Sequence, residues 1–267
     1  MNYLDTLNDE QKKAVTHLDG PCLVLAGAGS GKTRVLTTRI AYLIDNGIPS
    51  YNILAITFTN KAAKEMKERV CALVPENHAF VGTFHSLGVR ILRENYTECN
   101  LGSNFTILDS DDVLSLIKRI MKDKGIDSKE LSPSYVRNRI SFIKNENLSP
   151  REIDNLFNTA AEKQVLDIYE TYQDLIHKNN SVDFDDLLVL PVELFKKYPL
   201  VLEKYQERFK YILVDEYQDT NEVQYQFNKL LANKYRNLFV VGDANQSIYG
   251  FRNANFRNIL NFEKDYK

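Results

Sequence analysis

Phosphate-binding chemistry is suggested by residues 26–33, where three glycines precede Lys32 and Thr33 directly after the apolar run 22–25. Glycines leave room for backbone N–H groups to converge on phosphate oxygens, Lys32 adds a positive charge near the β- and γ-phosphates, and Thr33 can ligate Mg²⁺. The pattern therefore predicts a P-loop that binds ATP or GTP. Its usual first residue is glycine, where this chain has Ala26. The predicted nucleotide-binding residues of this segment are Ala26, Gly27, Ala28, Gly29, Ser30, Gly31, Lys32, Thr33 and Arg34.

The sequence on both sides favours a P-loop over a glycine-rich turn without a ligand. An apolar strand pattern precedes the loop, and Val35, Leu36, Ile40 and Leu43 follow it at the spacing of an amphipathic helix. A strand, a glycine-rich loop and a helix start are the context in which such a motif binds phosphate.

Two adjacent carboxylates, Asp215 and Glu216, end the apolar run 211–214 downstream of this loop. A P-loop enzyme needs acidic groups at such a place, so we expect Asp215 to hold Mg²⁺ together with Thr33. Glu216 is expected to orient and deprotonate the water that attacks the γ-phosphate. An isolated pair of carboxylates is usually solvated, but a pair at a strand end after a P-loop favours NTP hydrolysis over nucleotide storage.

Short apolar runs indicate the sheet that positions these groups. Continuous apolar strands separated by helical patterns indicate a parallel sheet with both faces buried, and ligands gather at the carboxyl ends of such strands. The expected strands are residues 22–26, 53–57, 80–83, 211–214 and 238–241. Residues 96–181 show no comparable run and are expected to form an all-helical insertion. The alternative is that these helices simply cover the sheet, but this stretch far exceeds the usual one-helix crossover.

Composition sets limits on the kind of protein. The 267 residues allow one or two domains, and 34 basic against 36 acidic residues give a formal charge of −2, so any nucleic-acid surface must be local. Cys22, Cys71 and Cys99 are widely spaced without a CxxC pair, which favours reduced thiols over disulfides or zinc. No apolar run approaches the roughly 20 residues of a membrane span, and the first residues lack a basic, apolar leader. A cytoplasmic location is therefore expected.

The motifs together resemble the N-terminal part of superfamily 1 DNA helicases of the Rep/UvrD/PcrA type. The resemblance covers nearly the whole chain, and its segments follow the family's order. They are residues 7–11 (Q motif), 26–33 (motif I), 56–66 (motif Ia), 82–86 (motif Ib), 182–188 (re-entry into the motor domain), 215–221 (motif II) and 241–252 (motif III).

The resemblance implies an α/β fold: a RecA-like P-loop NTPase whose parallel sheet is interrupted by an all-helical inserted domain. The motor domain would comprise residues 1–95 and 182–267, and the insertion residues 96–181. The implied cofactors are ATP and Mg²⁺, and the implied reaction is ATP hydrolysis coupled to 3′–5′ movement on single-stranded DNA and duplex unwinding. Gln11 would contact the adenine edge and Gln246 the γ-phosphate. The implied catalytic residues are Lys32, Asp215, Glu216 and Gln246.

DNA contacts are implied for residues of motifs Ia, Ib and III. The aromatic residues of this set are suited to stacking on bases, which is worth about 1–3 kcal/mol per base, and the polar ones to the phosphodiester backbone. The implied DNA-binding residues are Phe58, Thr59, Asn60, Lys61, Thr83, His85, Ser86, Tyr249, Phe251 and Arg252. Motif III departs from the family at Asn245, Phe251 and Asn253, where Asp, Trp and Gly are common.

Alternatives remain open for several of these side chains. Phe58 could belong to the core, and His85 could be a structural histidine. Lys64 and Lys67 are expected on a solvated helix face. For Arg137, Arg139 and Lys144 in the insertion, a duplex-facing patch and ordinary surface are equally plausible.

The family's second RecA-like domain, which supplies arginines to the γ-phosphate, does not follow within this sequence. Since an arginine finger is worth about 10³–10⁵ in rate, this chain alone is expected to hydrolyse ATP feebly. One alternative function is a nucleotide-gated module that binds single-stranded DNA without productive turnover; another is the motor part of a helicase–nuclease. Expected partners are single-strand/duplex junctions, the second motor domain and repair or replication proteins that load the motor, but no membrane.

Overall fold

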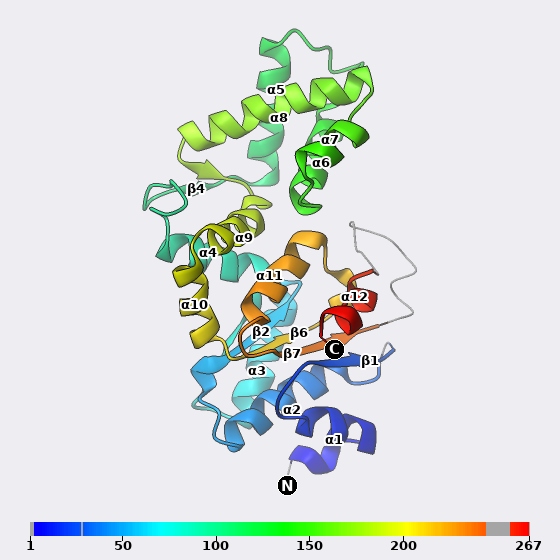
Figure 1. Cartoon of the computed structure of the whole chain (residues 1–267), viewed down its shortest axis with the longest axis vertical. Helices are drawn as coiled ribbons and strands as arrows, with labels where there is room; N and C mark the ends of the chain where they lie inside the picture. The colour runs from blue at the N-terminus through cyan, green and yellow to red at the C-terminus, as the bar shows by residue number, and fades with distance from the viewer. Residues whose placement is uncertain (1–2, 28, 244–256, 267) are drawn as a thin grey trace. The chain divides into compact units, whose positions relative to one another are not determined.

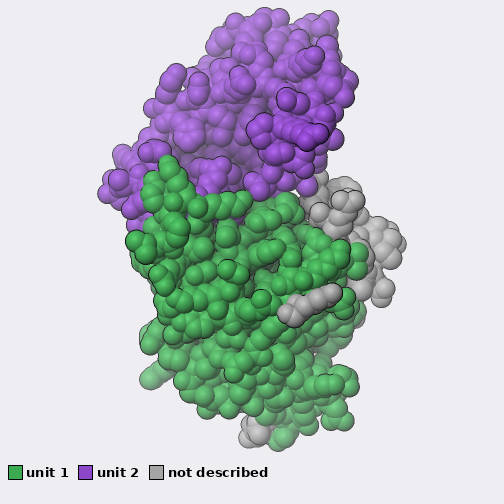
Figure 2. Space-filling model, viewed as in Figure 1, with its two compact units in different colours: residues 1–87, 195–267 green, residues 88–194 purple. Residues whose placement is uncertain are grey.

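The computed structural model describes residues 3–27, 29–243 and 257–266. Contacts divide the chain into two units, residues 1–87 with 195–267 (unit 1) and residues 88–194 (unit 2), coloured separately in Figure 2. Both divisions fall within helices, α4 (Phe84–Glu94) and α9 (Asp186–Lys197). The domain limits expected after residues 95 and 181 stay predictions.

Unit 1 contains a five-stranded parallel sheet in the order β1-β7-β6-β2-β3. Its strands are β1 (Cys22–Leu25), β2 (Ile53–Thr57), β3 (Phe80–Thr83), β6 (Tyr211–Val214) and β7 (Asn237–Gly242). Each expected apolar run forms one of them, so the predicted parallel α/β fold is confirmed. Burial differs from the expectation at β1, where Leu25 is 52% exposed because this strand ends the order of the described sheet.

Helices pack on both faces of this sheet (Figure 1). On one face, α2 residues such as Leu36 and Ile40 form a core with Ala55, Leu213 and Phe239 of the strands. Unit 1 contains the helices α1 (Asp9–Thr16), α2 (Lys32–Asp45), α3 (Asn60–Leu73), α10 (Pro199–Arg208), α11 (Glu222–Ala232) and α12 (Arg257–Asp265). It also has the 3-10 turns η1 (Tyr3–Thr6), η2 (Ser50–Asn52) and η3 (Tyr217–Asp219).

Unit 2 is built on the helices α5 (Ser110–Asp123), α6 (Pro133–Asn145), α7 (Pro150–Leu156) and α8 (Ala160–Lys178). Capping boxes at Asp109, Ser149 and Thr159 start α5, α7 and α8, because each cap side chain accepts a backbone N–H that has no partner within its helix. The insertion is helical as predicted, but it also holds a parallel pair of two-residue strands, β4 (Thr106–Ile107) and β5 (Ser181–Val182). Among the residues that the structure describes, no helix is long and apolar enough to cross a membrane.

A buried ion cluster ties α6 to the start of α9 in unit 2. The Lys144 ammonium lies 2.6 Å from a carboxylate oxygen of Asp183 and 2.8 Å from one of Asp186, and its side chain is 1% exposed. The Tyr172 hydroxyl donates a 2.7 Å hydrogen bond to Asp183. Burial opposes the charge of Lys144, but the two carboxylates raise its pKa above its usual value. For Asp186, burial outweighs the attraction of the lysine and raises the pKa to about 6.

These contacts decide the question left open for the basic residues of the insertion. Lys144 is buried and paired, so it is no part of a surface patch. Arg139 lies 3.4 Å from Glu162, and its guanidinium lies 4.2 Å from the centre of the Phe157 ring. For Arg137, a duplex-facing patch and ordinary surface both stay open, because no described contact of its side chain favours either one.

We predict that Lys144→Ala lowers the free energy of unfolding of unit 2 by about 3–5 kcal/mol, because it leaves buried carboxylates without their cation. Native-state hydrogen exchange of the α6 amides measures this loss. The control is Lys163→Ala, which removes an exposed lysine from α8 and should change little, within about 0.5 kcal/mol. Equal protection in the two variants would contradict the structural role of the cluster.

Candidate nucleotide site and nucleic-acid interface

The P-loop leaves the sheet between β1 and α2. The Ala26 N–H donates a 2.9 Å hydrogen bond to the Gly242 carbonyl, which extends the β1–β7 ladder into the loop. Gly29 and Gly31 both have positive φ, +75° and +85°, which favours glycine at these turns. Gly31 caps α2 without a side-chain hydrogen bond, so the first N–H groups of α2 can point at an anion. Ala28 lies outside the described residues.

Gln11 joins helix α1 to this loop. Its Nε2 donates to the Ser30 carbonyl at 2.9 Å, and its Oε1 accepts the Asn8 N–H at 3.0 Å in a capping box. Both ends of the side chain are thus bonded to the protein's own backbone, although the sequence predicts a contact with adenine. The structure supports a position beside the nucleotide site, and the adenine contact stays a prediction.

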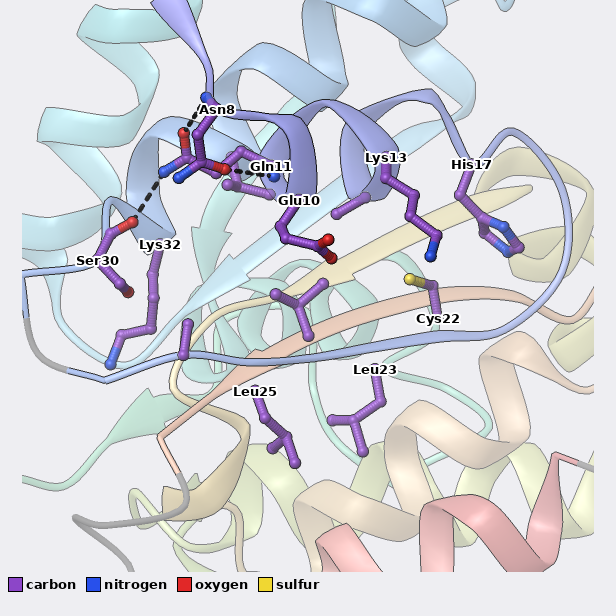
Figure 3. Close-up of a pocket in the computed structure, with 14 residues that line it drawn as sticks. Asn8, Glu10, Gln11, Lys13, His17, Cys22, Leu23, Leu25, Ser30 and Lys32 are labelled. Carbon is purple, nitrogen blue, oxygen red and sulfur yellow. Dashed lines mark hydrogen bonds between the residues drawn. The ribbon is translucent and has the colours of Figure 1, made fainter.

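A pocket of about 580 Å³ lies along α1, β1 and the P-loop (Figure 3). This volume falls in the usual range of roughly 300–1,000 Å³ for small-ligand sites. Figure 3 shows Gln11, Ser30 and Lys32 together at one end of the pocket and Lys13 and His17 at the other. A lysine thus lies at each end of the pocket, Lys32 at the P-loop end and Lys13 at the other.

The two predicted catalytic carboxylates follow β6 directly. The Asp215 N–H donates to the Ile56 carbonyl at 2.9 Å, so the β6–β2 ladder continues up to this predicted pair. Burial, and next the charge of Glu216, raise the pKa of Asp215 to about 6, against the opposing effects of the Glu216 N–H and Lys32. Glu216 itself has the left-handed backbone conformation, with φ +46°, which is unusual outside glycine.

Lys32 faces the acidic residues across the loop. Its ammonium lies 3.4 Å from Oε2 of Glu216 and 3.6 Å from Oδ2 of Asp243. The structure therefore brings together two predicted catalytic residues, Lys32 and Glu216. Thr33 and Arg34 follow in the first turn of α2, with Arg34 exposed. No described contact tests the metal role of Thr33 and Asp215.

Asp243 was not among the predicted site residues. It is 2% exposed and follows the last residue of β7. The available signal was its place at the end of an apolar run that neighbours the P-loop strand, where parallel sheets gather ligands. The predicted residues Gln246, Tyr249, Phe251 and Arg252 lie outside the described residues.

The motif Ia residues lie where β2 ends and α3 begins. Phe58 is half-buried, with its ring 5.6 Å from that of Phe84 in an edge-to-face arrangement. The Thr59 hydroxyl accepts the Ala62 N–H and so caps α3. Asn60 and Lys61 are exposed in the first turn of this helix, where they are accessible to a ligand. Lys64 and Lys67 are exposed as expected of a solvated face.

The motif Ib residues serve the start of α4. The Ser86 hydroxyl accepts the Thr83 N–H at 2.9 Å, and the Thr83 hydroxyl accepts the Ser86 N–H at 3.1 Å. The Thr83 side chain is buried, so its hydroxyl supports local structure. Burial lowers the pKa of His85, which favours a neutral ring. The DNA contacts of these residues stay predictions.

Comparisons with known proteins agree with these motifs. The family described as UvrD/REP helicase N-terminal domain matches residues 7–267. A protein of Staphylococcus epidermidis named ATP-dependent DNA helicase PcrA is 51% identical over 270 residues, which cover 100% of this chain and 37% of the relative. A protein of the same name from Staphylococcus aureus is 50% identical over 266 residues, which cover 98% of this chain and 36% of the relative. The chain thus spans about 37% of the length of the curated relatives it matches.

We predict that Gly31→Ala weakens binding of a magnesium nucleotide by about tenfold or more, since 1.4 kcal/mol corresponds to a factor of ten. The new methyl group would require a left-handed backbone, at about 1–2 kcal/mol, and would lie 3.0 Å from Nε2 of Gln11. Gly47→Ala is a matched control, because Gly47 has nearly the same φ, +86°, with no heavy atom within 4 Å of the added carbon. Titration with a fluorescent nucleotide should show weaker binding for the first variant only; equal affinities would contradict the proposed loop geometry.

Proposed function

The chain belongs to the UvrD/REP helicase family, and from this premise we propose that it forms the first RecA-like motor domain, with its helical insertion, of an ATP-dependent DNA helicase. The observation that carries the proposal is the placement of Lys32 against Glu216 at the carboxyl ends of β1, β6 and β7. A lysine that binds phosphates and a group that orients the attacking water are two of the parts that phosphoryl transfer to water uses. The name of the two relatives, ATP-dependent DNA helicase PcrA, favours turnover over a binding module without hydrolysis.

Lys32 and the start of α2 bind the triphosphate in this proposal. The ammonium neutralises oxygens of the β- and γ-phosphates, and the N–H groups of the loop and of the first helical turn donate to them. The Gln11 contact with Ser30 holds the loop in place. Gln11 also lines the pocket, and in this proposal it contacts the adenine edge there. The remaining predicted loop residues supply backbone donors.

Thr33 and Asp215 would hold Mg²⁺. A hydroxyl and a carboxylate are oxygen ligands of the kind that this cation prefers, and both follow elements that end at the same edge of the sheet. When bound, Mg²⁺ supplies neutralisation of phosphate charge. Asp215 is 6% exposed, and a cation would relieve the burial that opposes its ionised form.

Glu216 acts as the general base. Its carboxylate accepts a proton from the attacking water once Lys32 has turned to the phosphates, and Gln246 reports the γ-phosphate to the DNA-binding residues. The rest of the full-length protein would supply the second RecA-like domain and its arginines, without which hydrolysis is slow. A cytoplasmic location suits this role.

Single-stranded DNA binds along the loops after β2 and β3 in this proposal. Lys61 and Asn60 are exposed and suited to phosphates, while Phe58 presents a half-buried ring that can stack on a base. Such contacts carry no base code, as a motor that moves along any sequence requires. Movement with 3′–5′ polarity, action at single-strand/duplex junctions, and loading by repair or replication proteins complete the proposal.

We predict that Glu216→Gln in the full-length protein keeps nucleotide binding but lowers kcat by roughly 10²–10⁴, the usual contribution of a general base. Steady-state ATP hydrolysis with saturating single-stranded DNA measures this loss. Glu203→Gln is the matched control, because Glu203 also pairs with a lysine, Lys234, at 2.6 Å, but outside the P-loop site. Turnover by Glu216→Gln at the wild-type rate would remove Glu216 from the reaction.

We also predict that Lys61→Ala makes the salt dependence of DNA affinity shallower by up to about one unit, since one phosphate contact would be lost. Fluorescence anisotropy of a labelled oligonucleotide over a salt series gives this slope. Lys67→Ala removes an exposed lysine further along the same helix and should leave the slope unchanged. An unchanged slope in Lys61→Ala would show that Lys61 neutralises no phosphate.

A further inference from the structure

A buried glutamine lies between the ends of β6 and β7 and contacts both. Gln218 is fully buried in η3. Its Nε2 donates a 2.7 Å hydrogen bond to Oε2 of Glu216, and its Oε1 accepts the Asp243 N–H at 2.9 Å. Sequence motifs assign no role to this side chain beyond membership of residues 215–221.

With Lys32, these contacts close a ring. The Lys32 ammonium lies near the same Oε2 of Glu216 and near Oδ2 of Asp243. Going round, Lys32 contacts Glu216, Glu216 accepts from Gln218, Gln218 accepts from the Asp243 backbone, and the Asp243 carboxylate returns to Lys32. The ring links the P-loop helix, the residues after β6 and the end of β7.

The backbone is shaped to allow this arrangement. Parallel pairing of β6 with β7 places the residues after the two strands next to each other. Residue 242 is a glycine, and a Cβ atom added there would lie only 3.1 Å from Oε1 of Gln218. The left-handed conformation of Glu216 costs about 1–3 kcal/mol in general, and such conformations cluster at functional sites.

We propose that Gln218 and Asp243 are positioning residues of the ATPase reaction: Gln218 orients the Glu216 carboxylate, and Asp243 holds Lys32 until nucleotide phosphates displace it. The inference rests on the proposed function, since it assigns roles within the same site. Both residues act through their contacts with Glu216 and Lys32.

Charge balance supports the role of Asp243. Lys32 pairs with two carboxylates, Glu216 and Asp243, and its charge also acts on Asp215. Asp243 is buried, where Coulomb interactions are stronger than in water. Nucleotide phosphates are also anionic, so they compete with Asp243 for the same ammonium. The ion-pair distances of 3.4 and 3.6 Å leave Lys32 less tightly held than Lys144 in unit 2.

The same competition explains the need for Gln218. When Lys32 turns to the phosphates, Glu216 loses its cation just as it must face the attacking water. The amide of Gln218 is the described contact that remains on its carboxylate. A hydrogen bond to a charged group is worth about 1.5–3 kcal/mol, enough to fix one orientation.

Two variants of Gln218 in the full-length protein isolate the donated hydrogen bond. Gln218→Met keeps the chain length without charge, and Gln218→Glu keeps an acceptor for the Asp243 N–H; they share only the loss of the N–H donor. We expect kcat with saturating single-stranded DNA to fall about 10- to 100-fold in both. The dissociation constant for ADP, measured with a fluorescent analogue, should stay within about threefold of wild type in Gln218→Met.

Gln206→Glu is the matched control for a buried glutamine. Gln206 also donates through Nε2, at 2.8 Å, but to the Leu230 carbonyl on α11. Loss of kcat confined to one Gln218 variant, or equal loss in Gln206→Glu, would overturn the role of Gln218. A second test places Gln218→Met in the Glu216→Gln background, where it should lower kcat no further, since Gln218 acts through Glu216.

Asp243→Asn tests the second half of the proposal. The substitution keeps the side-chain size and the hydrogen bond that the backbone N–H of residue 243 donates to Gln218, but it removes one of the anions near Lys32. We expect ADP to bind about 3- to 30-fold more tightly, with or without Mg²⁺, because the phosphates meet less competition. Unchanged or weaker binding would overturn the role of Asp243. A wild-type protein without ATPase activity would instead contradict the proposed function, so the two failures are distinguishable.

Discussion

Strands β1, β7 and β6 lie parallel and in register, so the segments that follow them leave the sheet at one edge. The Ala26 N–H reaches the Gly242 carbonyl, and the Asp215 N–H reaches the Ile56 carbonyl of β2. The first bond, together with the pairing of β6 with β7, places the P-loop, the acidic pair and Asp243 beside one another, and the second extends β6 along β2 up to the acidic pair. The geometry of the proposed site thus depends on main-chain pairing, and each side chain needs only to extend from its strand end. The parallel pairing of β1, β7 and β6 therefore brings Lys32 close to Glu216 and Asp243, which are far from it in the sequence.

Two lysines that pair with carboxylates, Lys144 and Lys32, differ in burial and in the distance to their partners. In unit 2, Lys144 is 1% exposed and lies at hydrogen-bond distance from two aspartates, a contact that fixes α6 against the start of α9. In unit 1, the Lys32 side chain is 10% exposed and its carboxylate neighbours are more distant. Breaking the first pair would leave buried charge uncompensated, whereas the second can exchange one anion for another. Lys32 is therefore suited to bind and release phosphate.

The sequence predicted the parallel sheet well, because continuous apolar runs such as 211–214 and 238–241 identify buried parallel strands directly. Lys32 follows β1 and Glu216 follows β6, and the order of the strands in the sheet brings the two residues together. Asp243 directly follows the apolar run 238–242, which was the available signal, but its contact with Lys32 is visible only in the fold. Gln218 was missed for the same reason, since its two hydrogen bonds depend on the pairing of β6 with β7.

Other differences also arise from tertiary contacts. Lys144 looks like a surface residue in a polar helix, and only the fold shows the aspartates that bury it. Residues 106–107 and 181–182 are too short to stand out as strands, and they pair because the helices between them return the chain to the same place. Leu25 fits the pattern of a buried strand, yet β1 ends the order of the described sheet.

The most direct measurement is a crystal structure of the full-length protein with Mg²⁺ and a non-hydrolysable ATP analogue. The account predicts that the triphosphate lies on the P-loop, with the Lys32 ammonium moved from Asp243 and Glu216 to phosphate oxygens and Glu216 still bonded to Gln218. An analogue bound away from the P-loop would contradict the account, and so would phosphates in place while Lys32 remains paired with Asp243 and Glu216.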